Sequence, residues 1–593
     1  MDPSSPADLQ KLREAIRHSQ SELEPFRQQY RERLVQYAGD GYGDNRDAAD
    51  TPFNVYNLAL RIYKRRLFSG QMRVLVTSRS PSERRAAWEL GLAGDDVIRE
   101  INLDATFDKV LQQALLSVGI VKIGLVAEGT AESESYLQDA DQPYVEPVLL
   151  EDFAYDTAAK SWDQVDFAAN RYRVPLADVI DNPLFDPAAT EKLSPSDSRQ
   201  AEELRGDGVD DDSVQRLGTG SNMLREEIRE YVTLWDVWLP KEGLLVTMAD
   251  QSGGPALRIV PWEGPEHGPY ILLGFDVVPG NVMPIAPGAH LLGLARLLNR
   301  MMRKLGDQAD RQKIVTLVSR AASQNGTGQA AVEAEDGEAI PTDDPKAFTQ
   351  LKLGGIDQNS YAFFMGVMQL YSYLGGNIDT IGGLSSQADT LGQEKLLAEA
   401  GNGLISDMDA SVLMFLKQVL TDVCWYVYSD PTARRELIAR VEGTDYQLSV
   451  PWGPEKRTIP WFLFQFDVDP FSVHVRSPSE RLQSVMQMYQ TIVVPMMQFM
   501  GQAGITFDLE AFWRLLVRYT GLHELADLLK AGGIPITGEP KEAMGEMPSK
   551  SPFTSREYVR RNVGSGANTG MGQGPGQQAL QMMMKGEQVA QTV

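Results

Sequence analysis

Cysteine is nearly absent from this chain of 593 residues, which carries only Cys424. A single cysteine cannot form an intramolecular disulfide, so we expect the chain to fold in a reducing compartment. Cys424 lies within an apolar run, which predicts a buried thiol that packs as a small hydrophobe. With one cysteine and five scattered histidines, a cysteine-ligated zinc site is excluded and no metal site is predicted.

Motifs for nucleotide, hydride, metalloprotease and ester chemistry are also missing. The chain has no G-x-x-x-x-G-K-[ST] loop, no G-x-G-x-x-G after a strand, no H-E-x-x-H and no G-x-S-x-G. Its 81 carboxylates make chance pairs unavoidable, so no acid–base pair can be singled out. We therefore predict no catalytic residue, no cofactor and no enzymatic activity.

Targeting and membrane signals are lacking as well. The start "MDPSSPADLQKLREAI" has no basic segment followed by an apolar core, which predicts no signal peptide. No uninterrupted run of about 18 apolar residues occurs, so we expect no membrane span and no membrane partner.

Positive charge is scarce, because the formal net charge is −25 and the pI is about 4.7. This balance argues against a protein that coats nucleic acid by neutralising its phosphates. Hydrophobic residues make up 42% of the chain, which is ordinary for a folded protein and leaves room for several domains at this length.

The first half of the chain mixes helical and strand patterns. We predict that 1–52 is a charged helix with a break at Pro25, followed by a turn-rich linker. Helical periodicity continues over 83–118, with a break near Gly94. Four short strands after residue 225 are separated by turn signals, which indicates an antiparallel meander. We therefore expect 53–283 to be an α/β domain with antiparallel strands.

The centre of the chain has a different order of parts. Two helical stretches, 284–313 and 355–376, flank an excursion at 314–354 that has a strand candidate at each end. A glycine-rich loop, 377–393, then leads into a long helix. This order predicts a pair of helices with a projecting tip, followed by a loop.

The first central helix has a basic side and an apolar side. Its basic residues recur at helical spacing and form one stripe, which would face DNA or protein. The alternative is the solvated face of an ordinary amphipathic helix. The stripe consists of Arg296, Arg300, Arg303, Lys304 and Arg311.

The excursion between the two helices is acidic. An acidic edge on a strand-bearing tip favours a docking surface for another protein. Its carboxylates are Glu333, Glu335, Asp336, Glu338, Asp343 and Asp344.

The second central helix carries more bulky apolar residues than one narrow stripe can hold. We therefore expect it to pack against more than one neighbour, as a helix does within an oligomeric ring. These residues are Phe363, Phe364, Val367, Met368, Leu370, Tyr371 and Leu374.

The last third of the chain begins with a long helix and a strand-rich insert at 394–476, with kinks expected at Gly401 and Gly403. Helical patterns return at 477–537. The final 538–593 is rich in Gly, Met, Gln and Pro, which predicts a disordered tail.

This order of parts resembles the portal protein family of tailed bacteriophages over roughly residues 50–530. The phrases "QQALLSVGIVKIG" and "SSQADTLGQEKLLAEAG" are similar to the family's early wing and to its entry from the tunnel loop into the next helix. The resemblance implies a predominantly helical α+β fold with a wing at 53–283. It also implies two stem helices around a clip at 314–354, a crown at 477–537 and assembly into a ring.

The resemblance also implies a function. In this family a ring, usually a dodecamer, sits at one vertex of the virion capsid after assembly in the host cytoplasm, and double-stranded DNA passes through its channel without sequence preference. Its partners are the large subunit of terminase, which holds the packaging ATPase, the major capsid protein and scaffold, and the head–tail adaptor or neck proteins. A separate ATPase agrees with the missing nucleotide motif.

The loop at 377–393 would be the tunnel loop of such a ring. Glycines around it, among them Gly375 and Gly376, are expected to give it hinge freedom. Its polar residues would approach DNA through weak contacts; they are Asn377, Asp379, Ser385, Ser386, Gln387 and Asp389.

Three other interpretations stay open. The first is another head–tail connector or scaffold ring protein of a virion, for which this order of parts and this length are unusual. The second is a magnesium-dependent nuclease with scattered carboxylates, which a nuclease assay separates. The third is a cytosolic binding scaffold that never oligomerises, which microscopy of the purified protein separates from a ring.

Overall fold

Helices make up 53% and strands 22% of the residues that the computed structural model describes, which confirms the mixed α+β class predicted from the sequence. Among these residues no sheet closes into a barrel, and all of them belong to one unit, Met1–Glu480. The predicted crown at 477–537 and tail at 538–593 lie outside them. The described residues are 3–39, 53–125, 142–195, 230–251, 253–318, 348–353, 355–381, 391–430, 434–440, 447–453, 457 and 459–468.

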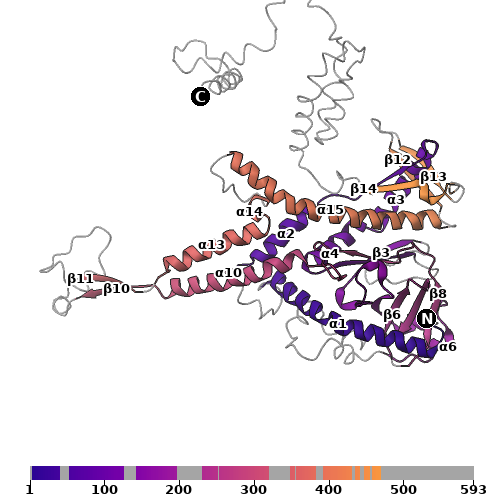
Figure 1. Cartoon of the computed structure of the whole chain (residues 1–593), viewed down its shortest axis with the longest axis horizontal. Helices are drawn as coiled ribbons and strands as arrows, with labels where there is room; N and C mark the ends of the chain where they lie inside the picture. The colour runs from indigo at the N-terminus through magenta and orange to yellow at the C-terminus, as the bar shows by residue number, and fades with distance from the viewer. Residues whose placement is uncertain are drawn as a thin grey trace, which may run out of the picture. The chain divides into compact units, whose positions relative to one another are not determined.

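A long first helix, α1 (Pro6–Ala38), covers one face of a five-stranded sheet (Figure 1). The predicted break at Pro25 is wrong, because the helix runs through it. The proline lacks the N–H of one helical hydrogen bond, but the residues around it are held firmly. Leu23 is buried, and the Arg27 guanidinium donates to the carbonyls of Leu150 (3.2 Å) and Phe153 (3.1 Å). Packing therefore outweighs the local cost of the proline.

The described strands form antiparallel pairs throughout. The largest sheet has the order β4-β5-β6-β7-β8, and a second has the order β3-β2-β9. Trp235 and Trp238 of β6 are buried on opposite faces of the larger sheet, as their alternation predicts. The strands of these two sheets are β2 Gly119–Leu125, β3 Pro143–Val148, β4 Phe153–Tyr155, β5 Ala168–Pro175, β6 Tyr231–Leu239, β7 Leu244–Ala249, β8 Ala256–Pro261 and β9 Tyr270–Leu273.

The predicted four-stranded meander holds for three strands only. Strands β6, β7 and β8 are consecutive neighbours, but β9 leaves them and pairs with β2 in the register Val121↔Ile271. Gly268 makes this exit, with a φ of +86° and a position against Trp238, where an added Cβ would lie 2.5 Å from the indole ring. The turn therefore redirects the chain from one sheet to the other.

Helices cover the second sheet and form the largest core. The break predicted at Gly94 is wrong, because α3 continues through it and ends at Glu100, before Asn102 in the left-handed region. Gly94 is needed for close packing, since an added Cβ would lie 2.7 Å from Cys424 Sγ. The remaining described helices of this half are α2 Val55–Leu67, α3 Arg84–Glu100, α4 Leu103–Leu116, α5 Leu176–Asp181 and α6 Pro187–Thr190.

A buried ion pair joins the two sheets. Lys122 Nζ of β2 lies 2.6 Å from Asp236 Oδ2 of β6, and the hydroxyls of Thr247 and Tyr172 donate to Asp236 Oδ1. Burial opposes ionisation of Asp236, but the positive charges of Lys122 and Arg258 and the hydrogen bonds from Lys122 and Thr247 outweigh it and hold the pKa of this carboxyl below its ordinary value. Lys122 is the nearest of these groups and helps to keep the buried carboxylate charged.

Loss of one partner of this pair should be costly. We expect Lys122→Met to lower the free energy of unfolding by roughly 3–5 kcal/mol, because Asp236 would be left as an uncompensated buried charge. The exposed pair between Lys241 and Asp166 offers a matched control, and Lys241→Met should leave stability unchanged. Urea denaturation measures both variants, and equal midpoints for Lys122→Met and the native chain would contradict the expectation.

Candidate functional site

Two neighbouring helices, α10 (Pro287–Asp310) and α13 (Gln358–Leu374), lead into a strand pair, β10 (Lys313–Val318) with β11 (Phe348–Leu353) (Figure 1). The strands are antiparallel, with a register that runs from Lys313↔Leu353 to Val318↔Phe348. The predicted helices and both predicted strands are confirmed. Between the strands, 319–347 lies outside the described residues and includes every predicted docking carboxylate, namely Glu333, Glu335, Asp336, Glu338, Asp343 and Asp344.

The base of α10 is packed tightly into the protein. An added Cβ at Gly288 would lie 2.4 Å from the Tyr56 hydroxyl and 2.8 Å from the Leu115 carbonyl, so only glycine allows α10 to approach α2 and α4. Leu291 and Leu298 then continue this buried side. The helix pair is therefore fixed at one end and projects at the other.

The predicted basic stripe of α10 lies on the exposed side of the helix. Arg296 is the member nearest the body of the protein, and its Nη2 lies 3.0 Å from Glu32 Oε2 of α1. The lowest part of the stripe therefore contacts the chain's own first helix. The stripe consists of Arg296, Arg300, Arg303, Lys304 and Arg311, all of which are exposed.

Helix α13 differs from α10 because it contains no charged residue. Its buried side chains, Phe364, Val367 and Tyr371, lie at three- and four-residue spacing on one side. Met368 is half-buried, and the other predicted bulky residues are on the surface. The exposed large apolar side chains are Tyr361 (51%), Phe363 (53%), Met365 (42%), Leu370 (47%), Tyr373 (71%) and Leu374 (49%).

The C-terminal end of α13 is anchored to α2 by two tyrosines. The Tyr63 hydroxyl donates to the Gly375 carbonyl (2.9 Å), and the Tyr371 hydroxyl donates to the Val55 carbonyl (3.1 Å). The chain then turns through Gly376 and Asn377, whose φ angles are +71° and +62°. These contacts fix the first predicted hinge glycines in place, so this end of the loop is a rigid base.

A short helix, α14 (Ile378–Ile381), follows this base, and Ile378 is buried. Among the residues predicted to approach DNA, Asn377 and Asp379 lie half-buried here, and the Asp379 N–H donates to Ser372 Oγ (3.3 Å). The others, Ser385, Ser386, Gln387 and Asp389, lie outside the described residues.

Helix α15 (Leu391–Ser429) is one long helix, as predicted, and the kinks at Gly401 and Gly403 stay a prediction. Its apolar side, which helical spacing predicts to face the core, is buried at Met408, Val412, Phe415, Val419 and Val423, whereas Leu404, predicted for the same side, is 40% exposed. The segment Gly403–Ser429 is long and apolar enough to cross a membrane by length and composition, but 56% of it is buried inside the protein, as in a core helix.

Cys424 of α15 is fully buried, as predicted, and burial raises the pKa of its thiol. Two residues earlier, Asp422 Oδ2 lies 2.8 Å from His267 Nε2, which comes from the loop between β8 and β9. This contact ties the loop to the helix, and no spacing pattern in the sequence indicated it.

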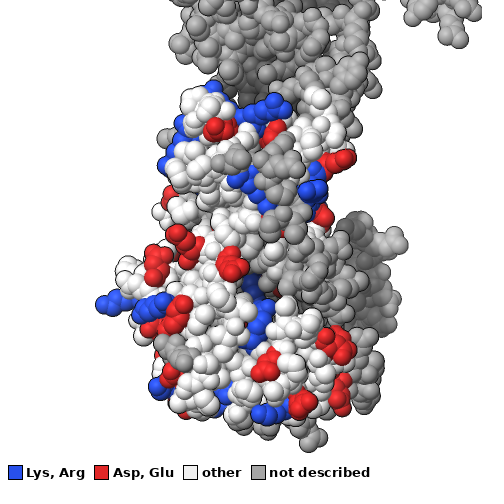
Figure 2. All heavy atoms as spheres, turned by 90° about the vertical axis from the view of Figure 1, so that its right-hand side faces the viewer, with Lys and Arg blue, Asp and Glu red and all other residues white. Residues whose placement is uncertain are grey.

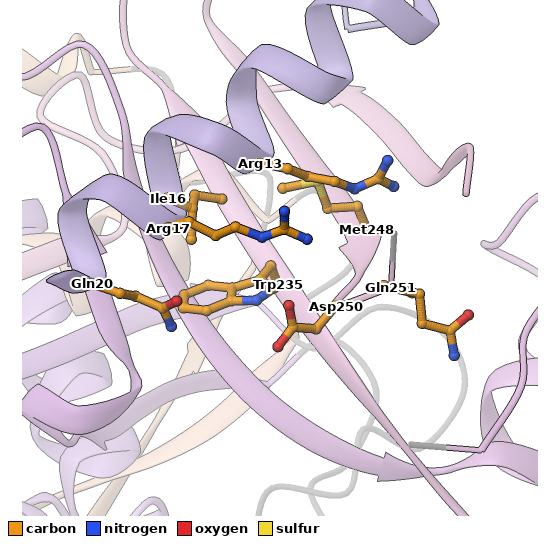
Figure 3. Close-up of a pocket in the computed structure, with 9 residues that line it drawn as sticks. Arg13, Ile16, Arg17, Gln20, Trp235, Met248, Asp250 and Gln251 are labelled. Carbon is orange, nitrogen blue, oxygen red and sulfur yellow. The ribbon is translucent and has the colours of Figure 1, made fainter. Parts of the chain in front are cut away.

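Figure 3 shows a small cavity, where Arg13 and Arg17 of α1 lie near Asp250 and Gln251 beyond β7. Its volume is about 10 Å³, which suits a single water molecule and no substrate. Arg13 Nη2 already donates to the Gly254 carbonyl at 2.5 Å. Among the described residues no group of three or more His, Cys, Asp and Glu side chains is placed to hold a metal ion.

Comparison with known proteins found no relative: no family model matches the chain, and no curated protein is similar to it.

Loss of the Tyr63 hydroxyl should loosen the base of the loop. We expect Tyr63→Phe to lower the free energy of unfolding by about 1 kcal/mol, because the buried Gly375 carbonyl loses its donor. Amide hydrogen exchange at Asn377 and Ile378 should become faster. The control is Tyr361→Phe, which removes an exposed hydroxyl from α13. Equal exchange rates at Asn377 and Ile378 in the two variants would contradict the anchoring role.

The His267–Asp422 contact should make stability depend on pH. Its hydrogen bond to Asp422 raises the pKa of His267, and burial raises the pKa of Asp422. Both groups therefore bind their protons more tightly when folded. The contribution of Asp422 is lost in the acid range, as the pH rises through its own folded pKa. The contribution of His267 is complete below about pH 6.5 and is lost as the pH rises through the folded pKa of His267.

We expect the difference in Tm between the native chain and His267→Gln to be larger at about pH 6 than at about pH 9, because glutamine keeps a donor that does not titrate. His290→Gln is the control, since the His290–Asp276 pair is exposed. A Tm difference that grows as the pH rises would contradict the expected direction of the pH dependence.

Proposed function

We propose that this chain is a portal protein, the subunit of a ring-shaped channel at one vertex of a viral capsid through which double-stranded DNA is packaged and ejected. The observation that carries the proposal is the uncharged, exposed apolar surface of α13 on a helix pair that ends in a strand pair. Water is a poor environment for such a surface, and soluble monomers rarely expose large contiguous apolar patches. Its natural cover is another copy of the chain.

The two helices offer different faces for this contact. If the α13 surface paired with itself, association would stop at a two-fold dimer, whereas contact between two different faces closes into a ring. The exposed stripe of α10 supplies the second face. Arginine side chains such as Arg300 and Arg303 have long apolar stems, and their guanidinium groups are attracted to aromatic rings such as Phe363 and Tyr373. We therefore place α10 of one copy against α13 of the next.

The order of elements supports the same assignment. In the portal layout α10 and α13 are the stem, β10 and β11 are the root of the clip, α14 and the following loop are the tunnel loop, and α15 is the long wing helix. The anchored base at Gly375 would hold each tunnel loop at the same height in the ring. Asn377, Asp379, Ser385, Ser386, Gln387 and Asp389 are the proposed approach to DNA.

The charge balance suits a passage for DNA. A wall that neutralised many phosphates would release counterions and bind DNA tightly, whereas a chain with a net charge of −25 lets DNA slide. Movement of DNA then needs an external motor, so the proposed partners are the terminase large subunit during packaging and adaptor or neck proteins afterwards. The capsid protein and scaffold would hold the ring in place, and the chain itself would have no enzymatic activity.

The test is to place a charge on the α13 surface. We expect purified native protein to form rings with a central hole of about a duplex diameter, and Phe363→Glu with Tyr373→Glu to give monomers, because each carboxylate would have to be buried in the interface. Mass photometry and negative-stain microscopy measure this. Capsids assembled with the double variant should also contain no packaged DNA.

Val277→Glu provides the matched control, because Val277 is 81% exposed in a loop outside the helix pair. It should form rings and support packaging. Native protein that stays monomeric at all concentrations would overturn the proposal. Normal DNA packaging in capsids that lack the ring would overturn it as well.

A further inference from the structure

A separate two-stranded sheet lies beside α15, far from the helix pair in sequence. It consists of β1 (Val74–Ser78) and β14 (Phe464–Val468), which pair antiparallel in the register Val76↔Phe466. Helix α3 packs against this sheet, and a second strand pair, β12 (Arg435–Arg440) with β13 (Gln447–Trp452), lies near α3 as well. Figure 2 shows that Lys and Arg side chains gather at the upper end of this face of the protein.

The hydrogen bonds of this sheet identify which backbone groups point outward. The Arg79 N–H donates to the Leu463 carbonyl (3.0 Å), which makes that pair a hydrogen-bonded one. Hydrogen-bonded and non-hydrogen-bonded pairs alternate along an antiparallel ladder. The pairs Val74↔Val468, Val76↔Phe466 and Ser78↔Phe464 are therefore of the second kind, and their N–H and C=O groups point away from the partner strand.

Side chains confirm this alternation at the end of the ladder. The Val74 N–H donates to Asp95 Oδ1, and the Val468 N–H donates to Asp467 Oδ1, both at 2.9–3.0 Å. The Phe464 N–H is taken by the Trp461 carbonyl. What remains in the middle of the β14 edge is the N–H and C=O of Phe466, and for these no partner is found among the described residues.

A groove of about 440 Å³ adjoins β14. It is lined by four consecutive residues of β14, from Phe464 to Asp467. Because successive side chains of a strand point to opposite faces, a groove lined by four in a row reaches the backbone of the strand as well as one of its faces. Lys417 and Thr421 of α15 line it too, together with Thr77 and Arg79 beside β1.

The floor of the groove is rigid and its rim is cationic. Phe466 stacks on Trp461 with ring centroids 4.7 Å apart, and Phe464 packs edge-on against Tyr428 at 5.7 Å. Arg79 and Lys417 are exposed and form no ion pair with another described residue. The Asp467 carboxylate also lines the groove and accepts the Val468 N–H, so the lining carries two basic side chains and one acidic one.

We propose that the β14 edge binds an extended acidic segment of a partner protein by strand addition. The backbone of the segment would pair with the Phe466 N–H and C=O, which supplies main-chain hydrogen bonds, and its carboxylates would lie near Arg79 and Lys417. The proposal does not depend on ring formation, because every group that it uses belongs to one copy of the chain.

The test uses a fluorescein-labelled octapeptide of alternating Glu and Val and the full-length protein, with fluorescence anisotropy as the readout. We expect saturable binding that weakens as salt is added. Arg79→Glu with Lys417→Glu should weaken it roughly tenfold, because two surface attractions become repulsions. Lys109→Glu, a charge reversal at an exposed site on α4, should change the affinity by less than about twofold.

A second probe separates strand addition from charge attraction alone. The same octapeptide with a methyl group on every backbone nitrogen keeps every carboxylate but loses all of its backbone donors on both edges, and we expect it not to bind. Equal binding of the methylated peptide, equal binding to the charge-reversed protein, or no binding of the Glu–Val peptide to the native chain would each overturn the proposal.

Discussion

Burial of α15 is the constraint on which the rest of the described structure depends. Its apolar face contributes to the same core as α2, α3, α4 and β14, so these elements cannot be placed without it. Gly94 allows α3 to approach it closely, and His267 ties a loop of the β-rich side to it. At its other end the helix begins beyond α14, next to the anchored base of the loop. Helix α15 therefore connects the region of the loop to the strand β14.

The helix pair of α10 and α13 divides two kinds of surface between two neighbouring elements. One helix presents long cationic side chains, and the other presents aromatic and aliphatic groups without charge. Both surfaces are exposed in one copy, although Arg296 of the stripe pairs with Glu32, because the inner side of each helix faces the other helix and the core. A single chain therefore carries both of the different faces that a head-to-tail contact needs, and such a contact can repeat from copy to copy.

Much of this architecture could be predicted from sequence because it rests on local patterns. Helical spacing located α10, α13 and most of the buried face of α15, and strand candidates were visible at the two ends of the excursion, at 313–320 and 347–353. Pro25 and Gly94 were misleading because tertiary packing, which no local rule contains, decided both positions. The exit of β9 toward β2 depends on a long-range pairing for the same reason.

The site was less predictable than the fold. The large number of bulky apolar residues between 358 and 374 can be read directly, and it already indicated a helix with several neighbours. The anchors Tyr63 and Tyr371 could not be identified, because a tyrosine whose hydroxyl reaches a distant carbonyl looks like any core aromatic in a sequence. The unpaired edge of β14 could likewise be identified only once the structure showed which of its residues form hydrogen-bonded pairs with β1.

The solitary thiol has a practical consequence. Cys424 is the only cysteine of the chain, it is fully buried against α3, and burial raises the pKa of its thiol, so little thiolate is available to react. A cysteine introduced at an exposed position would therefore be the only thiol that a maleimide reaches in the folded protein. The native chain is already a background for attaching a single dye, spin label or cross-linker, and no protective substitution in the core is needed first.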